Sequence, residues 1–201
     1  MALRKEKTGK EPVRILSGLR HQIINSYDKL AKACEGIKEI GATIVLTIGT
    51  WDETHIGHCR YLAKAREFGN VLVVGVDTDR AVKLYKGEDR PIVPFDERAE
   101  MITHLRYADF VTHIDDVEIN QGDKKPYWKY GLLKAIKPDI FVAVEDSYPD
   151  SQLGDIRRWC GEIIILPRQA ETSTSAIVRK KLIAENKTRF RKIKAQKRKK
   201  G

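Results

Sequence analysis

Five short apolar runs constrain the fold of this chain more than any other feature. They lie at residues 43–48, 71–76, 110–114, 140–144 and 163–166. Most of them lack the alternation of polar and apolar residues that a half-exposed strand shows, so we expect strands buried on both faces. Helices must then cover both faces of the sheet that these strands form. We therefore predict an α/β protein with a five-stranded parallel sheet and helices on both faces.

Helical patterns fill most of the sequence between these strands. We predict helices at residues 56–68, 95–107, 127–137 and 152–160. A further helical stretch, residues 15–40, ends at Gly41, a residue that commonly terminates helices. The predicted organisation is an N-terminal helical extension at 1–40, a domain at 41–183 and a basic tail at 184–201. A helical pattern that begins at Ser175 continues into this tail.

Composition excludes several classes of protein. The 201 residues suit one domain with extensions, and a 41% hydrophobic content is enough for a core. No apolar run approaches the ~20 residues of a membrane-spanning helix. The first eleven residues are charged, unlike a secretory signal. Three well-separated cysteines, Cys34, Cys59 and Cys160, suit a reducing compartment, so we predict a cytoplasmic protein.

The basic character of the chain is concentrated at one end. Residues 187–201 hold nine lysines and arginines and no acidic residue, so subtracting nine from the net charge of +10 leaves +1 for residues 1–186. A basic amphipathic stretch can contact nucleic acid or an anionic membrane surface, or can remain a solvated tail. These alternatives concern the tail and not the domain.

Polar residues follow the predicted strands, where ligands bind in parallel sheets. They are Gly49–His58 after the first strand, Asp77 and Asp79 after the second, Glu145 and Asp146 after the fourth, and Arg168–Ser175 after the fifth. Because the carboxyl ends of parallel strands lie at one edge, these groups are expected to converge there.

The segment Gly49–His58 joins the first strand to a helix. His55 and His58 lie three residues apart on the first turn, so their side chains face the same way. A helix N-terminus presents free N–H groups and attracts anions, and two imidazole donors would extend such a phosphate site. A structural histidine pair and a metal pair are the alternatives. Gly49 and Thr50 either approach a ligand closely or form an ordinary strand-end turn.

This segment resembles the signature of the nucleotidylyltransferase superfamily, in which a His-x-Gly-His motif binds nucleotide phosphates. The resemblance is strongest to the cytidylyltransferase-type branch, which includes glycerol-phosphate cytidylyltransferases and heptose-phosphate adenylyltransferases, and it implies a Rossmann-like fold. Two further landmarks follow in order. They are Lys86–Pro91 with Arg98, and Arg168 with Ser173-Thr174-Ser175.

The resemblance implies roles for individual residues. His55, His58, Lys86 and Arg98 would act on the phosphates, with Lys83 as a rival to Lys86 one turn earlier. The expected nucleotide-binding residues are Gly49, Thr50, Asp52, Asp79, Trp128, Asp146, Arg168, Ser173, Thr174 and Ser175. Alternatives remain for some of them: Asp79 can simply end a strand segment, Trp128 can be a core or interface residue, and Ser173–Ser175 can cap a helix.

The implied reaction joins a nucleoside triphosphate to a phosphorylated small-molecule acceptor and releases pyrophosphate. Catalysis of this kind depends on positioning and on charge stabilisation. Mg²⁺ is implied by the triphosphate, and no dedicated protein metal site is predicted. Gln169, Glu171 and Thr172 depart from the cytidylyltransferase pattern, so ATP and CTP both remain candidates. The acceptor is expected to be a sugar or polyol phosphate of the heptose phosphate or glycerol 3-phosphate type.

Two other functions compete with this prediction. An FAD-forming adenylyltransferase is the nearest enzymatic alternative. A nucleic-acid-associated protein that binds through its basic tail belongs to a different class, and its binding would weaken steeply with salt. The resemblance also implies a homodimer.

Overall fold

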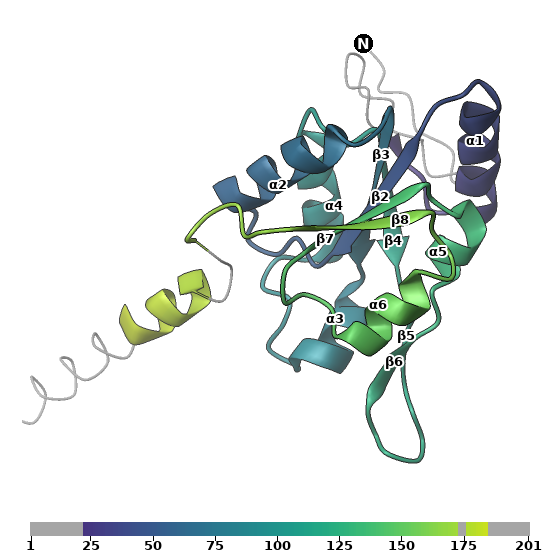
Figure 1. Cartoon of the computed structure of the whole chain (residues 1–201). Helices are drawn as coiled ribbons and strands as arrows, with labels where there is room; N and C mark the ends of the chain where they lie inside the picture. Colours follow the sequence, from purple (N-terminus) through teal and green to yellow (C-terminus); the bar gives the residue numbers. More distant parts are fainter. Residues whose placement is uncertain (1–21, 173–175, 185–201) are drawn as a thin grey trace, which may run out of the picture.

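A central parallel sheet organises the molecule (Figure 1). The computed structural model describes residues 22–172 and 176–184. The strands lie in the order β1-β4-β3-β2-β7-β8, and every pairing in this sheet is parallel. Their bounds are β1 Gln22–Ile23, β2 Ile44–Gly49, β3 Val71–Asp77, β4 Phe110–Ile114, β7 Ile140–Val144 and β8 Glu162–Leu166. The five predicted strands and the α/β Rossmann-like class are confirmed.

The short strand β1 is a sixth strand that the sequence did not predict. It pairs Gln22 with Phe110 and Ile23 with Val111 at the edge of β4. The prediction of one helix over residues 15–40 was therefore wrong at 22–26, and residues 15–21 lie outside the described part. Helix α1, Tyr27–Glu39, begins only after Ser26, whose side chain accepts a hydrogen bond from the Lys29 N–H.

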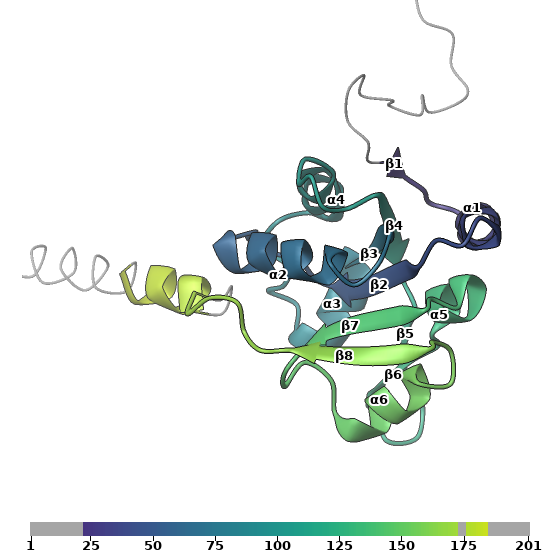
Figure 2. The same cartoon turned by 45° about the horizontal axis from the view of Figure 1, so that its top comes forward.

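Helices cover both faces of the sheet because alternate strand residues point to opposite sides. Val45 belongs to the cluster under α2 and α4, whereas Ile44 belongs to the cluster under α1, α5 and α6. Figure 2 shows α2 and α4 on one side and α5 and α6 on the other. The helices span α2 Ile56–Arg66, α4 Phe95–Thr103, α5 Gly131–Ile136 and α6 Asp150–Ile156.

Helix α1 is part of the packed core. Its Leu30 and Cys34 are buried among residues of β2, α5 and β7. The Tyr27 hydroxyl donates a hydrogen bond to the His113 carbonyl at 2.9 Å, and the two rings stack. This portion of the predicted N-terminal extension therefore packs directly on the sheet.

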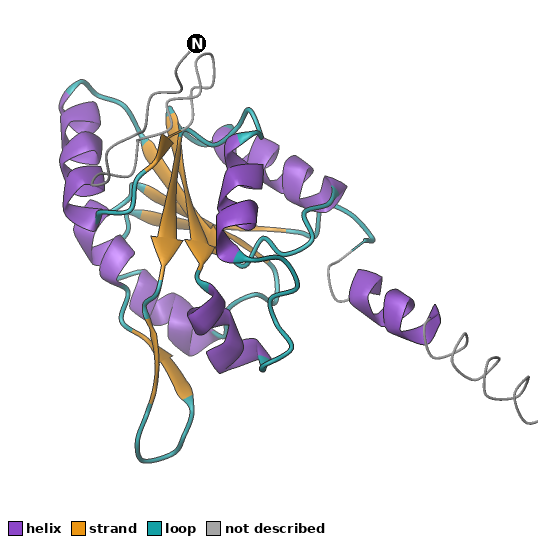
Figure 3. Ribbon diagram, turned by 180° about the vertical axis from the view of Figure 1, so that it is seen from behind, coloured by secondary structure: helices purple, strands orange, loops and turns teal. Residues whose placement is uncertain are grey.

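Two elements near the carboxyl edge of the sheet were not predicted. Helix α3, Asp79–Lys86, is capped by Thr78 and ends at Gly87, which adopts a positive φ of 99°. The strands β5 Val117–Ile119 and β6 Pro126–Trp128 form an antiparallel hairpin that extends from the body (Figure 3). The predicted helix at 127–137 was consequently wrong in its first part.

Strand order places the topological switch between β2 and β7. From β2 the chain proceeds to β3 and β4 on one side, and β7 and β8 then lie on the other side. Ligands bind outside the carboxyl ends of the strands at such a point. The segments that follow β2, β3 and β7 are therefore placed to form one site.

Residues 176–184 form a helix whose Lys181 makes an ion pair with Glu53. Residues 185–201, all but the first residue of the basic tail predicted at 184–201, lie outside the described part. None of the described helices is both long enough and apolar enough to cross a bilayer.

Candidate active site

A cavity of about 750 Å³ lies at the carboxyl ends of the central strands. Several predicted site residues line it: Gly49, Thr50, Asp52, His55, His58, Lys86, Trp128 and Arg168. They come from separate loops and helices, and the strand order brings them to one place. The geometry thus matches the predicted convergence for the segments after β2, β3 and β8, whereas Glu145 and Asp146 after β7 are not among the lining residues.

The two histidines form a reciprocal cap at the start of α2. The Gly57 N–H donates to His55 Nδ1 at 3.1 Å, and the His55 N–H donates to His58 Nδ1 at 3.3 Å. An imidazole whose Nδ1 accepts a hydrogen bond carries its proton on Nε2 when it is neutral. Each ring therefore retains one donor, its Nε2–H, and both residues line the cavity.

Burial keeps these imidazoles neutral. Desolvation lowers the pKa of His58 to about 4, and the neighbouring His55 and Lys86 also favour its neutral form. Desolvation also lowers the pKa of His55. The helix N-terminus disfavours added positive charge as well. At neutral pH the pair therefore supplies two uncharged hydrogen-bond donors.

Gly57 leaves the space that the His55 ring occupies. A Cβ at position 57 would lie 2.8 Å from His55 Cε1 and 2.9 Å from its Nδ1. The contact with the ring would therefore force the imidazole to move. The glycine of the motif is explained by this close approach.

The loop before α2 has an unusual backbone. Trp51 and Glu53 adopt positive φ angles of 55° and 45°, which non-glycine residues rarely adopt. The Trp51 indole is buried and donates to the Gly75 carbonyl at 2.9 Å. This indole contact helps to hold the strained loop and so sets where Thr50 and Asp52 lie.

Lys86 reaches the cavity from the last turn of α3. Its Nζ donates to Thr50 Oγ1 at 2.7 Å. Much of the side chain remains exposed, but loss of hydration around the ammonium group lowers its pKa. The rival Lys83 is exposed on the same helix and is not among the residues that line the cavity.

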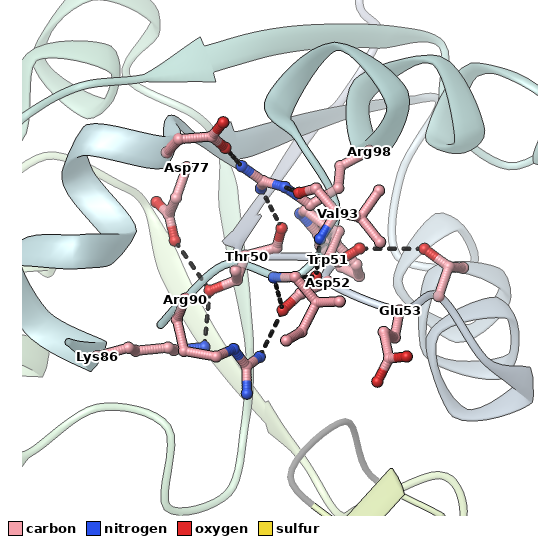
Figure 4. Close-up of polar contacts among 12 residues, drawn as sticks. Thr50, Trp51, Asp52, Glu53, Asp77, Lys86, Arg90, Val93 and Arg98 are labelled. Carbon is pink, nitrogen blue, oxygen red and sulfur yellow. Dashed lines mark hydrogen bonds and ion pairs between the residues drawn. The ribbon is translucent and has the colours of Figure 1, made fainter. Parts of the chain in front are cut away.

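Arg98 lies behind the cavity wall and does not line it, contrary to the predicted contact with phosphates. It is 1% exposed. Its guanidinium donates to the carbonyls of Thr50 and Val93 and pairs with Asp79 at 2.6 Å. Arg98 therefore positions the backbone of the motif loop, and Figure 4 shows it beside Thr50 and Val93. Asp79 serves as its counter-ion.

Asp52 connects the motif loop to the segment after α3. Its carboxylate accepts hydrogen bonds from the N–H groups of Ile92 and Val93 and pairs with Arg90 at 2.6 Å. The pKa of Asp52 is lowered because these hydrogen bonds and the Arg90 charge outweigh desolvation. Figure 4 shows Asp52 with Arg90 and Val93.

Arg90 is a functional candidate that the sequence did not single out. It lines the cavity, and its Nε is buried without a hydrogen-bond partner among the described residues. Its position beside Pro91, in the same segment as Lys86, could have identified Arg90 as a candidate from the sequence.

The remaining predicted residues lie in different settings. Trp128 packs against Tyr85 with ring centroids 6.0 Å apart. Arg168 is exposed at the rim, and its N–H donates to Glu145. Asp146 is exposed, has a φ of 62° and is not among the lining residues. Ser173, Thr174 and Ser175 lie outside the described residues.

The cavity continues beneath α5 and α6, where it is lined mainly by uncharged residues. Tyr130, Tyr148 and Gln152 contribute polar groups there, beside Leu133 and Phe141. The Tyr148 hydroxyl donates to the Ile48 carbonyl at 3.2 Å. No short motif marks these residues, so the sequence did not predict them.

A family model for cytidylyltransferase-like proteins matches residues 46–189. This chain belongs to the cytidylyltransferase-like family. The matched region contains the histidine motif, Lys86 and the strands that carry the cavity. Membership confirms the predicted superfamily and the nucleotidyltransferase class of enzyme.

Curated relatives extend this finding. The bifunctional protein HldE of Desulfatibacillum aliphaticivorans is 34% identical over 157 residues, which are 77% of this chain and 30% of the relative. HldE of Campylobacter fetus is 38% identical over 131 residues, which are 65% of this chain and 25% of the relative. The chain thus spans less than a third of the length of these two relatives.

A solved structure shares the fold. The lipopolysaccharide core biosynthesis protein of Thermoplasma volcanium matches with a TM-score of 0.52 and 24% identity. The match covers 64% of this chain and 98% of the other.

Proposed function

We propose that this chain transfers a nucleoside monophosphate from ATP or CTP to a phosphorylated sugar or polyol and releases pyrophosphate. The observation that carries the proposal is the pair of neutral imidazole donors of His55 and His58 at the N-terminus of α2, facing the cavity that Lys86 enters. Donors of this kind suit an anion that spreads negative charge over several oxygens.

The reaction requires no covalent enzyme intermediate. An oxygen of the acceptor phosphate attacks the α-phosphorus, a new P–O bond forms, and the bond to the bridging oxygen of pyrophosphate breaks. The Nε2–H groups of His55 and His58 donate to phosphate oxygens as negative charge moves onto the leaving group. Lys86 adds a positive charge near them, and Arg90 is a further donor at the same wall. Their contribution is positioning and charge stabilisation.

The acceptor would lie in the part of the cavity beneath α5 and α6. The cations among the described lining residues are Lys86, Arg90 and Arg168, and none of them comes from α5, β7 or α6. This favours an acceptor whose body is uncharged. The hydroxyls of Tyr130 and Tyr148 and the amide of Gln152 suit the hydroxyls of a sugar or polyol.

The resemblance of Lys86–Pro91 to heptose-phosphate adenylyltransferases favours a sugar phosphate as acceptor and ATP as nucleotide. Mg²⁺ is proposed to enter with the nucleotide. The described residues contain no group of three or more acidic, histidine or cysteine side chains that could hold a metal ion. Mg²⁺ keeps few protein ligands when phosphates supply the others, so the site is compatible with a phosphate-bound ion. When bound, the ion would neutralise phosphate charge.

A pyrophosphate-release screen tests this function. ATP and CTP are each combined with heptose 1-phosphate, glycerol 3-phosphate, phosphocholine and flavin mononucleotide. The proposal predicts release that requires both a nucleotide and a sugar or polyol phosphate. Release with flavin mononucleotide alone would support the FAD-forming alternative, and absence of release with every acceptor would contradict the proposal.

A further inference from the structure

Four polar side chains form a continuous line of hydrogen bonds at the floor of the cavity. Lys86 Nζ lies 2.7 Å from Thr50 Oγ1, and Thr50 Oγ1 lies 2.8 Å from the Tyr85 hydroxyl. The Tyr85 hydroxyl in turn lies 2.5 Å from Asp77 Oδ2. Asp77 also lies 3.5 Å from Thr50 Oγ1. Figure 4 shows Thr50 between Asp77 and Lys86.

The chemistry of Lys86 and Asp77, at the two ends of this line, determines which group donates in each hydrogen bond. The Tyr85 hydroxyl donates to Asp77 Oδ2, because a carboxylate oxygen accepts hydrogen bonds. A hydroxyl has one proton, and Tyr85 must therefore accept from Thr50. Thr50 then has no proton left for Lys86 and accepts from the ammonium group. Each donor thus points from Lys86 towards Asp77.

Burial affects the protonation of the two groups at the ends of this line of hydrogen bonds, Asp77 and Lys86. Asp77 is 6% exposed at the end of β3, and burial raises the pKa of its carboxyl. The hydroxyls of Tyr85 and Thr50 and the charges of Lys86 and Arg98 favour its ionised form. Burial has the opposite effect on the ammonium group, where desolvation lowers the pKa of Lys86.

Several other charged or titratable groups face Lys86 from the surrounding elements. Asp52 favours its charged form, whereas Arg90 and Arg98 disfavour it. His58 on α2 is also affected by the charge of Lys86. Asp77 is the largest influence that favours the protonated lysine.

We propose that Asp77 and Tyr85 are positioning residues that, through Thr50, keep Lys86 protonated and directed into the cavity. One N–H of the ammonium group is held by Thr50, and the other two remain for phosphate oxygens. Neither Asp77 nor Tyr85 needs to contact the nucleotide for this effect. The role of Lys86 in catalysis rests on the proposed function, whereas its protonation by this line of hydrogen bonds does not.

The first test measures the pKa of Lys86 without substrate. Lysines of the full chain are labelled with ¹³C at Cε, and the Lys86 signal is assigned by its loss in Lys86→Arg. Tyr85→Phe interrupts the line but keeps the ring against Trp128. The pKa of Lys86 is expected to fall by about one unit, because its protonated form loses support from Asp77. An unchanged pKa would overturn the proposal, whether or not the chain has the proposed activity.

Asp77→Asn provides a second, independent variant. It removes the charge and preserves the side-chain volume, so the pKa of Lys86 is expected to fall again. Tyr127→Phe is the matched control, because it removes a tyrosine–carboxylate hydrogen bond to Glu118 on the surface hairpin. An equal fall in this control would contradict a specific role for Asp77.

The second test uses turnover once the acceptor is known. In Tyr85→Phe, the alkaline limb of the kcat/KM profile for the nucleotide should move to lower pH by the same shift. The KM of the acceptor should remain near that of the unmodified chain. A uniform loss of activity at every pH, without movement of the limb, would indicate a merely structural role and overturn the proposal.

Discussion

His58 accepts a hydrogen bond from the backbone N–H of His55 through Nδ1, at 3.3 Å. This contact leaves Nε2–H as the donor of the neutral His58 ring. The sequence motif thus does two things at once: it caps α2 and sets the tautomer of the ring that faces the cavity. Loss of this histidine should therefore affect both the helix and the chemistry.

Replacement of His58 tests its donor role. His58→Ala should lower kcat by about 10²–10³-fold, the range for loss of one positioned donor. The measurement is pyrophosphate release at saturating nucleotide. His104→Ala is the control, because His104 is exposed at the end of α4. Near-normal turnover in His58→Ala would argue against the donor role.

The low pKa of His58 predicts a pH dependence of stability. The unfolded chain protonates this imidazole below about pH 6.5, but the folded chain does so only near about pH 4. Protons therefore favour the unfolded state as pH falls through this window. The stability contribution is complete above about pH 6.5, and about 3 kcal/mol is lost by about pH 4. Between neutral pH and about pH 4, urea unfolding should show a loss of stability in the unmodified chain that exceeds the loss in His58→Gln by about 3 kcal/mol.

Gly57→Ala tests the space around His55. The added Cβ would lie 2.8 Å from the His55 ring, so the imidazole must move, and the KM for nucleotide should rise at least about tenfold. Gly36→Ala on α1 is the matched control, since a Cβ added at that position would meet nothing within 4 Å. That control should gain up to about 1 kcal/mol of stability and keep its KM.

Arg98 should act mainly on stability and loop geometry. Arg98→Ala removes a buried guanidinium and leaves the carbonyls of Thr50 and Val93 without these donors. Because each buried acceptor left unsatisfied costs about 1–3 kcal/mol, the free energy of unfolding is expected to fall by about 2–4 kcal/mol. Chemical denaturation measures this loss. An Arg98→Ala protein as stable as the unmodified chain would contradict this structural role.

Removal of residues 187–201 separates the two classes of function. The proposed activity depends on the cavity, so pyrophosphate release should persist after truncation. Any nucleic-acid binding by the tail should disappear and, in the full chain, should weaken steeply with salt. Loss of pyrophosphate release together with the tail would show that the cavity alone does not suffice for the reaction.

The long strands were predictable because burial on both faces leaves apolar runs that need no further context. Helix α3 was missed despite the capping signals at Thr78 and Gly87, because it spans only eight residues. The helix predicted from residue 127 failed at the start because Pro126–Trp128 pairs with β5 and Tyr130 adopts a left-handed conformation with a φ of 58°. Pairing partners and turn geometry override local helical pattern.

The phosphate end of the site was predictable from a contiguous motif. His55 and His58 are close in sequence, so their shared face followed from helical spacing. Arg98 was misplaced because two of its partners are backbone carbonyls, which no residue pattern displays. Tyr85 and Asp77 come from different elements, and only the fold brings their side chains together.

Transfer of the α-phosphate is the most direct test of the central claim. The chain is incubated with Mg²⁺, a sugar phosphate and ATP or CTP labelled at the α-phosphorus, and the products are separated by charge. We expect that label moves to a nucleoside diphosphate sugar or polyol, that pyrophosphate forms in equal amount, and that His58→Ala largely abolishes both. Label that remains in the nucleotide with every acceptor tested would contradict the claim.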